Sequence, residues 1–117
     1  MKDFKKLQIW QKGIVIVKLC YKLTAQLPTT EKFNLISQIN RAAVSIPSNI
    51  AEGSSRRSEQ DCFRFLEIAL GSCFELETQV ILLMELGLIT SDSMNELLSE
   101  IRYEQQMISA FSQKLQI

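Results

Sequence analysis

Apolar residues recur every three or four positions along the chain, as amphipathic helices require, and no stretch alternates like a β-strand. Residues 7–27 carry two such apolar stripes. The first is Leu7, Trp10, Ile14, Val17 and Tyr21, and the second is Ile9, Ile16 and Leu23. A helix with two stripes can bury one in its own bundle and offer the other to a neighbouring subunit. Pro28 ends this helix, because proline disfavours helical geometry in the residue before it.

A second helix is predicted over 29–53, with Thr29 or Thr30 as its N-cap. Its apolar stripe is Leu35, Ile39, Ala42, Ile46 and Ile50. Pro47 lies inside this pattern, where it lacks a backbone N–H and predicts a kink near residues 43–46. Gly53 is expected to adopt the left-handed conformation that ends many helices.

The third helix is predicted over 58–87, because Ser58 and Asp61 have capping-box spacing and Gly87 can end it. Its stripe steps by four and three through three heptads, which predicts antiparallel packing at a shallow angle. The stripe is Cys62, Leu66, Ala69, Cys73, Leu76, Val80 and Leu83. Gly71 interrupts this helix at a cost of about 1 kcal/mol relative to alanine, which indicates a close helix approach.

The fourth helix is predicted over 90–115, with residues 90–93 as its cap and Ser93 and Glu96 in capping-box spacing. Its stripe is Met94, Leu97, Ile101, Ile108, Phe111 and Leu115. Glu104 falls in this stripe where an apolar residue is expected. Four helices with short loops predict an all-α fold, an up-down-up-down antiparallel four-helix bundle that forms one domain over residues 1–117.

The composition narrows the chemistry. The chain has no histidine, which removes the Glu-x-x-His metal motif, most catalytic triads and the commonest general base. It has no glycine-rich phosphate loop. Cys20, Cys62 and Cys73 have no metal-binding spacing and are predicted to be buried thiols. We therefore expect a protein that is not an enzyme and holds no cofactor and no metal.

The apolar runs are too short to span a membrane, and the N-terminal residues lack the apolar core of a signal peptide. We therefore expect a cytoplasmic protein without a membrane partner.

A row of polar residues on the second helix faces polar residues of the third and forms the candidate site. The set is Arg41, Ser45, Asn49, Glu52, Ser72 and Glu75. Unpaired polar groups at a packed interface cost about 1–3 kcal/mol each, so we expect them to pair, with Arg41 and Glu75 as an ion pair. We interpret the set as a network that fixes the register of two helices. A recognition pocket or a catalytic site is the alternative.

Net charge is zero but unevenly spread: residues 1–27 carry +5, residues 28–57 carry +2 and residues 58–117 carry −7. This split predicts complementary faces that meet within one chain or between copies. The serine-rich loop 54–58 holds the best candidates for phosphate contact. With the N-terminal lysines, the candidates are Arg56, Arg57, Lys2, Lys5 and Lys6. The alternative is a solvated loop, since nucleic-acid-binding proteins usually have a basic excess.

Two segments of the chain and several positions near its start carry a family resemblance. Residues 38–53 read Gln-Ile-Asn-Arg-Ala-Ala-Val-Ser-Ile-Pro-Ser-Asn-Ile-Ala-Glu-Gly, and residues 65–69 read Phe-Leu-Glu-Ile-Ala. Gly71-Ser72 and residues 75–78, Glu-Leu-Glu-Thr, follow. Further matching positions are Phe4, Leu7, Trp10, Gln11, Pro28 and Glu31. These residues resemble the bacterial four-helix-bundle family, also called the large-subunit ribosomal RNA intervening-sequence proteins.

The resemblance implies a four-helix bundle that assembles into a closed homo-oligomer, typically a pentamer, and it implies no particular activity. Members are often encoded inside insertions in ribosomal RNA genes. The family is also similar to the accessory variability proteins of diversity-generating retroelements, basic bundles that bind nucleic acid and a reverse transcriptase. This chain departs from them in its zero net charge. The leading hypothesis is a non-enzymatic, self-assembling scaffold or adaptor. The alternative is an RNA-binding module associated with ribosomal RNA or a reverse transcriptase.

Overall fold

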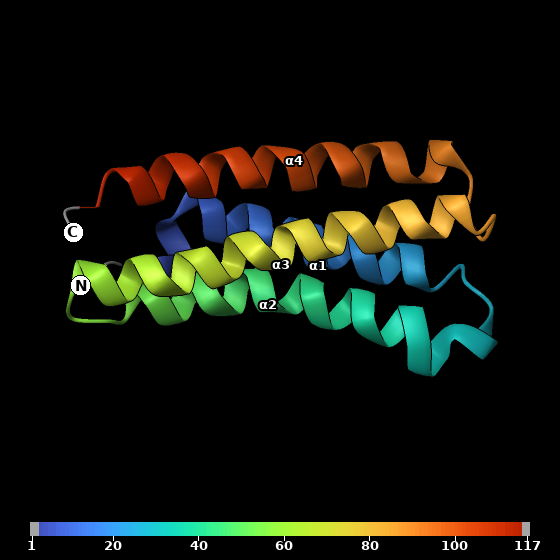
Figure 1. Ribbon diagram of the computed structural model, residues 1–117, viewed down its shortest axis with the longest axis horizontal. Coiled ribbons are helices and arrows are strands. Elements are labelled where there is room, and N and C mark those ends of the chain that lie inside the picture. Colours follow the sequence, from blue (N-terminus) through green and yellow to red (C-terminus); the bar gives the residue numbers. More distant parts are fainter. Residues whose placement is uncertain (1–2, 116–117) are drawn as a thin grey trace.

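The computed structural model describes residues 3–115, and at positions 32 and 33 only the backbone. Four helices lie side by side along the long axis of a bundle of 44 × 23 × 20 Å, each running opposite to the one before it (Figure 1). They are α1 (Gln8–Thr24), α2 (Ser37–Ser54), α3 (Glu59–Glu85) and α4 (Ser91–Gln113). A short 3-10 turn, η1 (Phe4–Lys6), precedes α1. The predicted all-α four-helix bundle is confirmed.

The core runs the length of the bundle and is filled mainly by branched aliphatic side chains from all four helices. Burying one such side chain stabilises the fold by about 1.5–3 kcal/mol. The predicted stripes of the last three helices account for most of this core. Their fully buried members include Ile39, Ile46, Ile50, Leu66, Leu76, Val80, Leu83, Ile101 and Ile108.

Helix α1 turns its second predicted stripe inward. Ile9, Ile16 and Leu23 are buried together with Cys20, whereas the first stripe is half-buried and its member Tyr21 is 52% exposed. The buried face of α1 also contains Gly13. The predicted stripes of α1 contain only large apolar residues and therefore leave out Gly13 and Cys20. Both are buried where α1 packs against its neighbours.

The close approach of α1 to α2 occurs where Gly13 meets Pro47. A Cβ added to Gly13 would lie 3.2 Å from the Cβ of Pro47, so a side chain there would push the proline ring away by a few tenths of an ångström. Pro47 is buried, and α2 continues past it to Ser54. The amount by which Pro47 kinks α2 stays a prediction.

The start of the second helix differs from the prediction. A 3-10 turn, η2 (Thr29–Glu31), and a π-helical turn, η3 (Lys32–Ile36), lead directly into α2, so Thr29 and Thr30 are not its N-caps. The helical winding continues from one form to the next, and therefore the backbone needs no side-chain cap at Ser37. At this end Thr24 of α1 lies 3.3 Å from the side-chain oxygen of Asn40 in α2.

Glycine roles are distributed differently from the predictions. Gly53 does not end α2 in a left-handed conformation, since among the described residues only Gly87 has a positive φ, of 71°. Gly53 is instead buried in the last turn of α2, where an added Cβ would lie 2.9 Å from the Cβ of Phe65. Gly71 is exposed, and an added Cβ there would meet nothing within 4 Å, so the close approach predicted there is wrong.

The helix ends also test the predicted caps. The Ser58 side chain accepts a 3.1 Å hydrogen bond from the Asp61 backbone N–H, so Ser58 caps α3 as predicted. Gly87 ends α3 as predicted: its N–H donates to the carbonyl of Met84, and the N–H of Leu88 donates to that of Leu83. The N-cap of α4 is Thr90, within the predicted cap at residues 90–93. Ser93 lies inside the first turn, so it does not form the predicted capping box with Glu96.

The glycine packing predicts opposite effects for two alanine substitutions. Gly53→Ala should lower the free energy of unfolding by about 1–3 kcal/mol, because the new methyl group collides with Phe65. Gly71→Ala, the matched control in an open helical position, should raise it by about 0.5–1 kcal/mol. Urea unfolding followed by circular dichroism measures both, and two changes of the same sign would contradict this packing.

Candidate functional site

Three members of the polar row meet between α2 and α3. The Ser45 and Ser72 hydroxyl oxygens lie 2.8 Å apart and form a hydrogen bond across the two helices. The Asn49 side-chain amide donates to the Ser45 hydroxyl at 2.9 Å and to the Ser45 carbonyl at 2.8 Å. Ser72 is buried, and Ser45 and Asn49 are half-buried. The three side chains therefore satisfy one another inside the α2–α3 interface.

The predicted ion pair between Arg41 and Glu75 does not form. Both residues are exposed, and within residues 3–115 no ion pair joins them. Glu75 instead accepts a hydrogen bond of 3.3 Å from the Gln79 side chain. The reason is helix geometry: a step of four residues advances about 40° beyond a full turn. Two such steps from Asn49 to Arg41 therefore turn Arg41 about 80° away, out of the interface.

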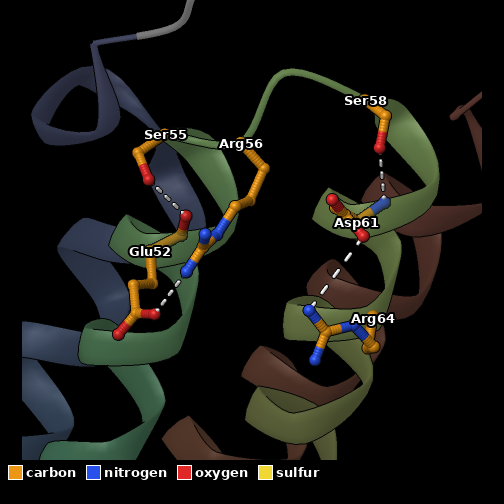
Figure 2. A network of polar contacts seen from close by, with 6 residues as sticks. All are labelled: Glu52, Ser55, Arg56, Ser58, Asp61 and Arg64. Atoms are coloured by element: carbon orange, nitrogen blue, oxygen red, sulfur yellow. Dashed lines mark hydrogen bonds and ion pairs between the residues drawn. The ribbon is translucent and has the colours of Figure 1, made fainter.

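Glu52 belongs to a second cluster where α2 ends and α3 begins (Figure 2). A carboxylate oxygen of Glu52 lies 2.8 Å from a guanidinium nitrogen of Arg56, and the Ser55 hydroxyl donates to the Glu52 carbonyl at 2.7 Å. The guanidinium of Arg56 also lies 4.6 Å from the centre of the Phe65 ring, and that of Arg64 lies 4.7 Å from it. Cation–π contact thus holds two arginines on one buried ring.

The contact between Arg56 and Phe65 was not predicted from the sequence. Phe65 sits at an otherwise ordinary helical position, and its place opposite Arg56 depends on how the loop between α2 and α3 folds. Arg56 therefore already has two partners within the bundle, the Glu52 carboxylate and the Phe65 ring.

The remaining candidates for nucleic-acid contact are exposed. Arg57 lies in the loop between α2 and α3, and Lys5 and Lys6 lie in η1. The segment that begins α1 and this loop occupy the same end of the bundle (Figure 1). Lys2 lies outside the described residues. The same region carries Asp3, whose carboxylate accepts the Lys5 backbone N–H at 3.1 Å.

The charge split of the sequence leads to a contact within the chain. The Lys12 ammonium of α1 lies 2.6 Å from a carboxylate oxygen of Glu100 in α4, and both side chains are 24% exposed. Lys12 also lies 5.4 Å from the centre of the Tyr103 ring. On the other flank of α4, hydrogen bonds from Gln105 and Arg102 lower the pKa of Glu77 in α3.

Glu104 is the polar residue that broke the predicted stripe of the fourth helix, and the structure buries it completely. Neither carboxyl oxygen has a hydrogen-bond partner within the described part of the chain. Burial raises the pKa of Glu104 to about 8; Lys12 acts to lower this pKa, and Glu100 acts to raise it. At neutral pH Glu104 is therefore mostly an uncharged carboxylic acid inside the core.

Two of the three cysteines are fully buried, as predicted, and burial raises the pKa of Cys20 to about 12 and that of Cys73 further. Cys62 is half-buried. A thiol with a raised pKa is a poor nucleophile. In residues 3–115, no group of three or more histidine, cysteine, aspartate or glutamate side chains could hold a metal ion. The described helices include none long and apolar enough to cross a membrane.

These features define an antiparallel four-helix bundle with a hydrogen-bonded polar contact between α2 and α3 and a buried carboxyl group in its core. The model of the 23S rRNA-intervening sequence protein family matches residues 5–110, and the chain belongs to this family. A solved structure from Bacteroides thetaiotaomicron, described as a protein of unknown function from the S23 ribosomal protein family, has the same fold. It aligns with a TM-score of 0.83 and 23% identity over 91% of this chain and 99% of its own. The sequence matches no curated protein.

The polar contact between α2 and α3 predicts energetic coupling. Ser45→Ala and Ser72→Ala should each lower the free energy of unfolding by about 0.5–1.5 kcal/mol, and the double variant should lose less than their sum. Arg41→Ala, which removes an exposed side chain from the same row, should change it by less than about 0.5 kcal/mol. A double-mutant cycle in urea measures the coupling. Strict additivity of the two serine variants would show that the row does not fasten the helices.

Proposed function

We propose that this protein is a non-enzymatic, self-assembling scaffold or adaptor in which α1 binds a neighbouring copy of the chain. The single observation that carries the proposal is the first apolar stripe of α1, which its own bundle leaves half-exposed. The stripe consists of Leu7, Trp10, Ile14, Val17 and Tyr21.

The stripe lies on the flank of α1 that adjoins α2. Thr24 contacts Asn40, and Gly13 approaches Pro47, so α2 borders this flank. Val44 of α2 lies one turn from both Asn40 and Pro47 and is 40% exposed. The stripe and Val44 together form what we call the α1–α2 surface. An apolar surface of this kind is stabilised when a partner covers it.

An aromatic contact lies at the N-terminal end of the α1–α2 surface. Phe4 packs edge-on against Trp10, with ring centres 5.3 Å apart, and so extends the aromatic part of the stripe toward the N-terminus. A surface that binds a different surface of the next copy generates a ring when the rotation closes. A ring of five copies is the stoichiometry that the family resemblance implies.

Two glutamate substitutions at equally exposed positions test this assembly. Tyr21 on α1 and Phe74 on α3 are both 52% exposed, so a charge at either position leaves the core intact. Tyr21→Glu should convert the oligomer to a monomer, because burying the new charge in an interface is costly. Phe74→Glu, the matched control, should keep the mass of the unmodified protein.

Light scattering coupled to gel filtration at micromolar concentration measures the mass, and circular dichroism confirms that each variant is folded. A monomeric unmodified protein would overturn self-assembly itself. Dissociation by Phe74→Glu with no effect of Tyr21→Glu would place the interface on another surface.

A second candidate function is RNA binding at the end of the bundle that carries η1 and the loop between α2 and α3. It is favoured by the exposed side chains of Lys5, Lys6 and Arg57, which share this end. The family name refers to 23S rRNA, which supports ribosomal RNA as the probe. The resemblance to proteins that accompany a reverse transcriptase makes such an enzyme the corresponding protein partner.

RNA affinity should depend on Arg57 more than on Arg56. Arg57→Ala combined with Lys6→Ala should weaken binding to a ribosomal RNA fragment and reduce the salt dependence by about one logarithmic slope unit per lost phosphate contact. Arg56→Ala should have a smaller effect, because Arg56 is held by Glu52 and Phe65. Arg41→Ala, near the opposite end of α2, is the control. Filter binding at several salt concentrations measures these effects, and unchanged affinity in the Arg57 and Lys6 variant would exclude the site.

A further inference from the structure

The buried carboxyl group of Glu104 lies on the side of α4 that faces α1. Glu100 precedes it by one helical turn and therefore shares this side of the helix. Lys12 of α1 is bound to Glu100 at 2.6 Å. The arrangement is thus one ammonium group beside two carboxyl groups, of which one is paired and the other is enclosed with no hydrogen-bond partner among the described residues.

The titratable and charged groups around Glu104 come from three helices. α1 supplies Lys12, and α4 itself supplies Glu100. α3 supplies the buried thiol of Cys73, which stays protonated, and Glu77, which is already bound by Arg102 and Gln105. The buried residues of α2 are all uncharged. Lys12 is therefore the cation in the described structure that can compensate a negative charge at Glu104.

We propose that Lys12, Glu100 and Glu104 form a proton-controlled latch that holds α4 against α1. With the proton in place, Glu104 is neutral and packs in the core while Lys12 binds Glu100. When Glu104 releases its proton to solvent, two carboxylates compete for one ammonium group. Lys12 then turns toward the core or water enters beside Glu104, and either change separates α4 from α1 locally.

The direction of the pH effect follows from the two pKa values. Glu104 has a pKa of about 8 in the folded protein against an ordinary 4.5, so between these values the folded protein binds one more proton than the unfolded chain. The stability contributed by the neutral acid is fully present below pH 4.5 and is lost as the pH rises to about 8. Across this window the folded-to-unfolded ratio falls by about three orders of magnitude on account of this group.

The latch predicts that the contact between α1 and α4 opens while the rest of the bundle stays folded. Amide hydrogen exchange of α4, corrected for the intrinsic pH dependence, should accelerate between pH 4.5 and 8 and level off above pH 8, whereas exchange in the α2–α3 interface should stay slow. Glu104→Gln keeps the shape of the side chain and cannot ionise, so its exchange in α4 should be independent of pH over the same range. Equal acceleration in the unmodified protein and in Glu104→Gln would overturn the proposal.

Two further variants separate a latch from simple burial, because they should shift the pKa of Glu104 in opposite directions. Glu100→Gln should lower it, since the substitution removes a like charge and releases Lys12. Lys12→Met should raise it, since it removes the cation and keeps an apolar stem. Both positions are partly exposed, so these variants should fold even if Glu104→Gln does not.

Carboxyl carbon NMR of the full chain follows the titration of Glu104 directly. A titration near pH 8 with the two opposite shifts supports the latch. A titration near 4.5, or the same shift in both variants, would exclude it. The result is independent of self-assembly, because the latch lies between α1 and α4, and Tyr21→Glu provides the same titration in a monomer.

Discussion

Gly13 and Gly53 let the backbone of α2 approach both of its neighbours. At one point the ring of Pro47 packs tightly over Gly13, where an added Cβ would lie 3.2 Å from the Cβ of Pro47. At the other, the Cβ of Phe65 would lie 2.9 Å from a Cβ on Gly53. These two contacts seat α2 between α1 and α3. The hydrogen bond between Ser45 and Ser72 and the position of Phe65 under Arg56 both depend on this seating.

The packing of the helices also decides which charged residues are paired. The basic first helix and the acidic last helix lie side by side, and Lys12 binds Glu100 at their contact. Lys12 is thus paired within the chain and does not add its positive charge to a basic surface. At the end of the bundle, Arg56 is engaged by Glu52 and Phe65. These two contacts reduce the positive charge left free at the surface, which is why we propose a scaffold before an RNA-binding module.

Polar residues in the interior follow two different solutions to one physical problem. Between α2 and α3 the hydroxyl and amide groups bond to one another, so their burial costs little. Between α1 and α4 the carboxyl group of Glu104 has no such partner in the part of the chain that the structure describes, and at neutral pH it mostly retains its proton. The first solution is insensitive to pH, whereas the second links the stability of the bundle to proton concentration.

The sequence by itself determined the four helices, the bundle and the family. Apolar residues spaced three or four positions apart, and an N-cap such as Ser58, act through neighbouring residues of the chain and can be read from the sequence. It also identified Ser45, Asn49 and Ser72 as polar residues that need partners, and Glu104 as a breach of the core. Only the tertiary structure decided which stripe of α1 is buried, that Gly53 rather than Gly71 marks a close approach, and that Arg41 points to solvent. These outcomes depend on the axial rotation of each helix and on its distance from its neighbours. Both are set by contacts between residues far apart in the chain, which no local pattern contains.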